Sequence, residues 1–413
     1  MIKMMTSTEN RATIGKALAL AFLVASLLAT LLSSAPAGAD VVPAGNARSW
    51  GDNYFGQLGN GSSGTATSRN IPGAVKNLSG VRSIKAGCAH GLGLKTDGTV
   101  RAWGDNSYGQ LGDATVGIDS NVPVEPYELD NVKAISAGCN HNLALKENGA
   151  VWAWGDNEYG QLGNGLSGPG VHANSPVRVA SLGTGVKAVA AGRDFSLALM
   201  ENGTVMSWGK NSDGQLGNGQ ALPGTVRTVP FEVANLSGVR AIATDSQARH
   251  ALALRQDGTV RAWGDNLSGQ LGNGDFFPGT DKAVPVRVKN LSGVKALATG
   301  GYHSLALLSS GKVRSWGSNV DGQLGNDRSG IDAARSTPGN VSGLDNVKSI
   351  SGGAIHSLAV LESGRARAWG DNEYGQLGNG NTGTDSDTPV GIENLVDARS
   401  IDGGYEFTLA VTG

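Results

Sequence analysis

The sequence contains few charged residues and no run of lysine or arginine. Charged residues make up 16% of the 413 residues, and the formal net charge at pH 7 is −2. A protein that binds nucleic acid usually carries clustered basic residues that neutralise the phosphates. The composition therefore argues against a nucleic-acid partner.

The sequence also lacks the motifs of common catalytic and metal sites. It has no Ser/His/Asp set in a known hydrolase order and no His-Glu-x-x-His motif. Three Gly-x-Gly-x-x-Gly matches occur, but no helical pattern follows them, as a nucleotide site would require. We therefore expect no catalytic residues, no cofactor and no metal.

Only one stretch is apolar enough to enter a membrane, and it lies at the N-terminus. Residues 17–32 follow the basic residues Lys3, Arg11 and Lys16, and residues 37–39 read Ala-Gly-Ala, which fits a signal-peptidase site. A retained anchor is the alternative, although the apolar run is shorter than the ~20 residues of a membrane span. We expect residues 1–39 to be a cleaved signal peptide and the mature protein to be secreted, without membrane contact.

Glycine, by contrast, is abundant, and much of it belongs to a repeat. The 64 glycines suit many short strands that are joined by tight turns. A Trp-Gly pair recurs about every 53 residues and opens a turn that ends in Gly-Gln-Leu-Gly. The seven tryptophans are Trp50, Trp103, Trp154, Trp208, Trp263, Trp316 and Trp369.

Between these turns the sequence alternates as short strands. Residues 81–84, 90–94 and 100–103 have strand patterns, and Asp97-Gly98 is a strong hairpin signal. A further strand before Val81 gives about four strands per repeat, which is a β-propeller blade. Since stacked blades bury each other's faces, we predict an all-β, seven-bladed β-propeller of four-stranded antiparallel blades over residues 40–413.

The two ends of the repeat series are offset from each other. Trp50 has no strand pair before it, and the strand segment at residues 403–411 has no Trp-Gly after it. We predict that residues 46–50 pair with the C-terminal strands and complete the seventh blade, which removes exposed strand edges. We expect a monomer.

The turn Trp-Gly-x-Asn-x-x-Gly-Gln-Leu-Gly and the strand Ala-Gly-x-x-His-x-Leu-Ala-Leu resemble the regulator of chromosome condensation repeat family. The resemblance covers residues 46–413 and implies the propeller fold. It implies several functions, because the founding member is an exchange factor for a Ran-type GTPase and others are protein-interaction or ubiquitin-ligase modules. Secreted bacterial propellers of similar architecture include an inhibitor of class A β-lactamases.

Five repeats carry a histidine at one shared position, namely His90, His141, His250, His303 and His356. A ring of histidines could bind a metal. Phe195 and Phe407 hold the same position in the other two repeats, and phenylalanine cannot act as a ligand. We therefore interpret this position, like the tryptophans, as structural.

Cys88 and Cys139 are the only cysteines, and they occupy equivalent positions in adjacent repeats. In a secreted protein such a pair suggests a disulfide, which requires Cα atoms within about 4.4–6.8 Å of each other. Two free thiols at a position for small residues are the alternative.

The residues that vary between repeats are the candidates for binding. Aromatic residues precede Gly-Gln-Leu-Gly in four consecutive turns of the ring, and a second variable set lies beside the histidine position. The first set is Tyr54, Phe55, Tyr108, Tyr159 and Tyr374, and the second includes Arg193, Arg249, Tyr302 and Tyr405. An aromatic arc is typical of a protein-binding patch, although tyrosine could simply be common at this position of the repeat.

These observations predict a secreted, non-catalytic propeller that binds a protein partner of unknown identity through one loop face. Three alternatives stay open: an inhibitor of a β-lactamase or penicillin-binding protein, a glycan-binding or enzymatic propeller, and an exchange factor by family analogy.

Overall fold

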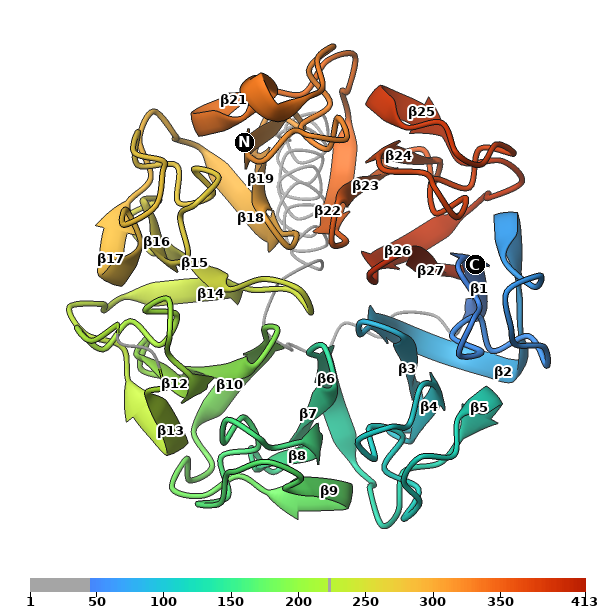
Figure 1. The fold of residues 1–413 in the computed structure, drawn as a ribbon, viewed down its shortest axis with the longest axis vertical. Helices are drawn as coiled ribbons and strands as arrows, with labels where there is room; N and C mark the ends of the chain where they lie inside the picture. The colour runs from blue at the N-terminus through green and yellow to red at the C-terminus, as the bar shows by residue number, and fades with distance from the viewer. Residues whose placement is uncertain (1–44, 222–223) are drawn as a thin grey trace, which may run out of the picture. The chain divides into compact units, whose positions relative to one another are not determined.

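The computed structural model describes residues 45–221 and 224–413, which form 27 β-strands and one short 3-10 helix, η1 (Ile331–Ala333). The expected signal peptide lies outside the described residues. Within the described part of the chain, no helix is long and apolar enough to span a bilayer. Figure 1 shows seven blades arranged around a central axis, so the predicted all-β propeller is confirmed.

Each blade has four antiparallel strands, with the first strand nearest the axis. Blade 1 contains the end of β2 (Arg69–Ala86), β3 (His90–Lys95), β4 (Val100–Gly104) and β5 (Ser120–Val124). Blade 2 contains β6 (Val132–Ala137), β7 (His141–Lys146), β8 (Val151–Asp156) and β9 (His172–Arg178). Blade 3 contains β10 (Val186–Ala191), β11 (Phe195–Met200), β12 (Val205–Lys210) and β13 (Val226–Glu232).

The remaining blades follow the same order. Blade 4 contains β14 (Val239–Ala243), β15 (His250–Arg255), β16 (Val260–Gly264) and β17 (Lys282–Arg287). Blade 5 contains β18 (Val294–Thr299), β19 (His303–Leu308), β20 (Val313–Gly317) and β21 (Arg335–Asn340). Blade 6 contains β22 (Val347–Gly352), β23 (His356–Leu361), β24 (Ala366–Gly370) and β25 (Ser386–Gly391). Blade 7 contains β26 (Ala398–Gly403), β27 (Phe407–Thr412), β1 (Gly45–Gly51) and the start of β2.

The N-terminal strand closes the ring. Strand β1 pairs with β27 from Asn46 opposite Thr412 to Gly51 opposite Phe407. Strand β2 then serves two blades, since its first part pairs with β1 and its last part pairs with β3. The predicted closure is therefore confirmed, and blades 7 and 1 are joined in one seven-stranded sheet.

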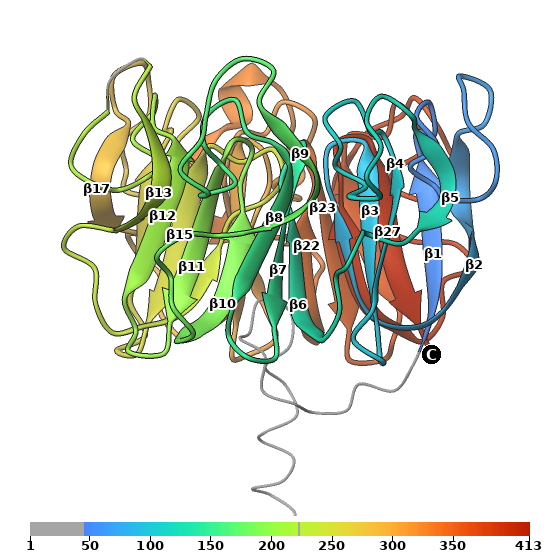
Figure 2. The same cartoon turned by 90° about the horizontal axis from the view of Figure 1, so that it is seen from below.

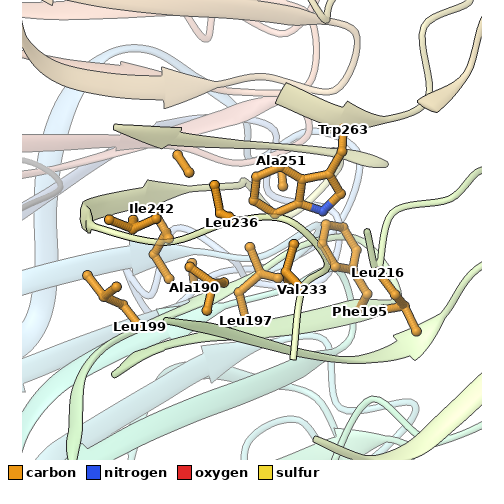
Figure 3. Close-up of a cluster of buried hydrophobic side chains, with 13 residues drawn as sticks. Ala190, Phe195, Leu197, Leu199, Leu216, Val233, Leu236, Ile242, Ala251 and Trp263 are labelled. Atoms are coloured by element: carbon orange, nitrogen blue, oxygen red, sulfur yellow. The ribbon is translucent and has the colours of Figure 1, made fainter. Parts of the chain in front are cut away.

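The tryptophans fill the spaces between blades. Figure 3 shows Trp263 of blade 4 beside Phe195, Leu197 and Leu216 of blade 3, in a cluster of fully buried side chains. Each indole Nε1 donates a hydrogen bond of 2.8–2.9 Å to the glutamine carbonyl in the turn of the preceding blade. Because Trp50 bonds to Gln376 in the same way, the seven bonds form a closed series.

The molecule has two different loop faces. Asp105 N donates to Ala89 O at 2.9 Å, so the turn after Trp103 lies beside the loop between β2 and β3. A Cβ on Gly104 would lie 2.4 Å from that same carbonyl, which explains the glycine after the tryptophan. We call the side that carries the Trp-Gly turns and these inner loops the turn face. The Asp-Gly hairpins and the end of β27 lie on the opposite side, which is the lower side in Figure 2.

Candidate protein-binding face

The backbone of each turn is held by its own side chains. In the turn after Trp50, Asn53 Oδ1 accepts a hydrogen bond from Leu58 N at 2.9 Å. Gln57 Oε1 accepts one from Phe55 N at 2.9 Å, and Gln57 Nε2 donates to Asp52 Oδ2 at 2.7 Å. The constant residues therefore fix the turn and leave the variable positions to face outward.

All candidate binding residues lie on the turn face, but the structure gathers only some of them. Tyr54, Phe55 and Tyr374 line one open depression of about 370 Å³ between blades 6 and 7. Asp52, Thr65 and Glu406 complete the lining. Tyr108 and Tyr159 lie on the turns of blades 1 and 2 and do not line this depression.

Glu406 is the most unusual group of the depression. Its burial, together with the negative charges of Asp52, Asp371 and Glu373, raises the pKa of its carboxyl to about 7. Asp371 is affected similarly, and burial is the main reason that its pKa rises to about 6. Among the described residues, no hydrogen bond or ion pair engages the Glu406 carboxylate. The depression therefore combines aromatic walls with negative charge, and no cation of residues 45–221 or 224–413 lines it.

The second candidate set surrounds the axis on the same face. Tyr302 and Tyr405 are exposed. Burial, Glu406 and Tyr302 raise the pKa of the Tyr405 hydroxyl while Arg193 opposes them, so these groups lie close enough to interact. Arg249 is half-buried, and its Nε atom is fully buried and has no hydrogen-bond partner among the described residues. Tyr302 and Tyr405 can therefore contact a partner directly.

The comparisons with known proteins match this architecture. The RCC1-like domain matches residues 172–413, and the regulator of chromosome condensation (RCC1) repeat matches residues 45–94 and 97–145, with a second form at 81–110 and 132–161. The ultraviolet-B receptor UVR8 of Arabidopsis thaliana is 32% identical over 339 residues, which cover 80% of this chain and 74% of the receptor. The chain belongs to the RCC1 repeat family.

Two further relatives show how far this RCC1-repeat likeness extends. The human E3 ubiquitin-protein ligase HERC2 is 34% identical over 346 residues, or 81% of this chain, but that match spans only 7% of the ligase. The crystal structure of Prp20p from Saccharomyces cerevisiae, described with its binding to Gsp1p and histones, has a TM-score of 0.79 and 26% identity. It covers 90% of this chain and 92% of Prp20p, so the fold is shared over nearly its full length.

The repeat histidines hold neighbouring RCC1 blades together. Each Nε2 lies 2.8–3.1 Å from a polar side chain of the next blade, and that side chain in turn donates to the carbonyl of the turn glutamine. The pairs are His90–Asn142, His141–Ser196, His250–Ser304, His303–Ser357 and His356–Thr408. Since each hydroxyl already donates its hydrogen, its histidine donates through Nε2. Burial lowers the pKa of these four rings to about 3, so they are neutral at pH 7.

No group of three or more His, Cys, Asp or Glu side chains is arranged to hold a metal in residues 45–221 and 224–413.

The two phenylalanines at the histidine position are also matched to the residue that they meet in the next blade. Where Phe195 and Phe407 occur, the next blade carries Ala251 and Gly91 in place of the polar partner. Both phenylalanine rings are fully buried, and they carry no polar atom that would need a hydrogen-bond partner.

Cys88 and Cys139 form a disulfide, with Cα atoms 4.5 Å apart, between the inner loops of blades 1 and 2. Their surroundings include a feature that sequence reasoning missed. The inner loop before His250 has six residues where the others have three, and Gln247 within it reaches across the axis. Gln247 Nε2 contacts Cys88 Sγ and lies 3.7 Å from Cys139 Sγ. The insertion therefore covers the axis at the turn face, and aligning the inner loops would have revealed it.

A second missed feature is an aromatic pair in blade 4. Phe276 and Phe277 follow the Gly-Gln-Leu-Gly turn, and their stacked rings have centroids 4.0 Å apart. Phe277 is 61% exposed. These two residues lie after Gly-Gln-Leu-Gly, whereas the predicted aromatic arc rests on the two residues before it.

Proposed function

We propose that this RCC1-repeat protein is a secreted, non-catalytic propeller that binds a partner protein through its turn face. The observation that carries the proposal is the set of aromatic side chains on rigid turns of one face. Tyr54 is 52% exposed and Tyr108 is 41% exposed. Tyrosine on a fixed backbone offers a large contact area at little cost in conformational entropy.

The compartment and the family support the same proposal. The N-terminal sequence has the features of a signal peptide, and disulfides such as Cys88–Cys139 persist mainly in oxidising compartments. Prp20p, which has the same fold, is described as binding the proteins Gsp1p and histones. Its example supports protein recognition as a use of this scaffold, without naming the partner of this chain.

The test is affinity capture from culture medium with the purified mature protein, followed by a measured dissociation constant for the captured partner. Replacing Tyr54, Tyr108, Tyr159 and Tyr374 together with alanine should weaken binding by about 100-fold or more, because central aromatic residues carry most of the energy of such interfaces. Tyr127→Ala is the control, since Tyr127 is an exposed tyrosine outside the Trp-Gly turns. Equal binding by the fourfold variant would show that the turn face is not the site.

A further inference from the structure

Two blade junctions of the propeller begin with the same ten residues. The turn of blade 2 reads Asp-Asn-Glu-Tyr-Gly-Gln-Leu-Gly-Asn-Gly at 156–165, and the turn of blade 6 repeats it at 371–380. Tyr159 and Tyr374 are therefore equivalent residues in identical turns. Each of them faces the inner loop and the Trp-Gly turn of the following blade.

At the first of these junctions, a cation of the chain occupies the space beside the tyrosine. Lys210 Nζ lies 4.3 Å from the centre of the Tyr159 ring. It also lies 3.1 Å from a carboxylate oxygen of Asp194. The junction between blades 2 and 3 thus combines a cation–π contact with an ion pair, and both stabilise the positive charge.

The second junction has the same frame but lacks the lysine. Glu406 corresponds to Asp194, and Asp52 corresponds to Lys210. The backbone bond between these two positions is conserved, at 3.0 Å from Lys210 N to Asp194 O and at 2.8 Å from Asp52 N to Glu406 O. The aromatic ring and the acceptor carboxylate are therefore kept, while the cation is replaced by a second carboxylate.

The space left at this junction is the depression between blades 6 and 7. Its volume of about 370 Å³ is at the lower end of the range for ligand sites, so it suits one side chain better than a large ligand. Tyr54 and Phe55 form an edge-to-face pair of rings, with centroids 4.8 Å apart, and line the depression together with Tyr374. A cation from outside would meet aromatic rings and two carboxylates at once.

We propose that an arginine side chain of the partner protein binds in this depression, with its guanidinium against Tyr374 and paired with Glu406 and Asp52. Arginine fits better than lysine, because its planar guanidinium can stack on a ring and pair with two acceptors together. The inference rests on the proposed function, since it names the chemistry that the turn face recognises.

The test uses a fluorescein-labelled Gly-Arg-Gly-Arg-Gly peptide and the same peptide with citrulline in place of arginine. Citrulline keeps the shape of arginine without its charge. Fluorescence polarisation should show that the arginine peptide binds at least about tenfold more tightly than the citrulline peptide. Binding of the arginine peptide should weaken at high salt. Equal binding of the two peptides, or no binding of either, would overturn the inference.

Substitutions at equivalent positions give matched variants. Asp52→Lys restores the internal cation seen at Lys210, so we expect arginine-peptide binding to fall about tenfold or more. Asp156→Lys makes the same charge change two blades further on, beside Asn140 rather than an acidic residue, and should leave binding within about twofold. Equal effects of the two variants would contradict a specific site.

Two more variants keep the test decisive if Asp52→Lys unfolds. Glu406→Gln removes one acceptor and should also weaken arginine-peptide binding about tenfold. Lys210→Asp should create a second site beside Tyr159 and raise the stoichiometry measured by calorimetry from one to two. If the captured partner needs the turn tyrosines but tolerates both Asp52→Lys and Glu406→Gln, the arginine inference fails while the proposed function stands.

Discussion

At the scale of single residues, the polarity of one blade is matched to that of the next. A histidine in one blade always meets a hydroxyl or amide in the following blade, and a phenylalanine always meets a position without a polar side chain. A buried polar group without a partner costs about 1–3 kcal/mol. We therefore expect a histidine that faces a residue without a polar side chain, or a phenylalanine that faces a hydroxyl or amide, to destabilise the junction.

The first prediction tests this matching at the junction of blades 4 and 5. Ser304→Ala leaves His250 Nε2 without its acceptor and should lower the free energy of unfolding by about 1–3 kcal/mol. Adding His250→Phe recreates the Phe195–Ala251 pair and should recover about 1 kcal/mol or more of that loss. Urea denaturation of the single and double variants measures the coupling. Additive losses would show that the two positions do not depend on each other.

The second prediction concerns Glu406 and pH. The pKa of this carboxyl rises from the usual 4.5 to about 7 in the folded protein, so the fold favours the protonated form. The contribution of this carboxyl to the free energy of unfolding is therefore fully present below pH 4.5 and is lost as the pH rises through 7. Glu406→Gln should raise the melting temperature at pH 8 and leave it nearly unchanged at pH 4.5. Thermal denaturation at both values checks this, and the same shift at both would contradict it.

At the scale of strands and loops, the parts that repeat locally were the parts that sequence could predict. The Trp-Gly turns and the Asp-Gly hairpins gave the blade number, the order of strands and the pairing of the termini, because each signal lies within a few residues. The outer strands were harder. Strand β9 runs from His172 to Arg178, and its inner residues are all half-buried, so no alternation in the sequence marks its ends.

The candidate site was only partly predictable for a related reason. The aromatic turns could be assigned to one face, because all of them hold the same place in the repeat. The grouping of Tyr54 with Tyr374 and Glu406 depends on ring closure, which brings residues more than 300 positions apart into one depression. The insertion at Gln247 was missed, because the spacing of the tryptophans also varies with the outer loops and conceals two added residues.

The third prediction belongs to the inner loops. The Cys88–Cys139 disulfide links loops of adjacent blades across 51 residues of chain, and a bond of this kind usually contributes about 2–4 kcal/mol. The double variant Cys88→Ser, Cys139→Ser should lose that amount in guanidinium denaturation. Dithiothreitol should destabilise the wild type equally and leave the double variant unaffected. A wild type that is insensitive to the reductant would contradict the prediction.

At the scale of the whole molecule, one of the seven blades differs in how it is built. Within blade 7, β1 is joined to β27 by pairing alone, since the two strands come from opposite ends of the chain. The contacts at this place are otherwise the same as elsewhere. Trp50 is fully buried like the other repeat tryptophans, and its Nε1 donates to Gln376 O at 2.9 Å.

The last prediction follows from that equivalence. Trp208 makes the same bond to Gln161 within the continuous part of the chain. If the ring is closed as firmly by pairing as by covalent connection, Trp50→Ala and Trp208→Ala should each lower the free energy of unfolding by about 3–5 kcal/mol, because both remove a buried tryptophan. Urea denaturation compares the two. A much smaller loss for Trp50→Ala would mean that the terminal strands separate before the rest of the ring unfolds, whereas equal losses show seven equivalent junctions that unfold as one cooperative unit.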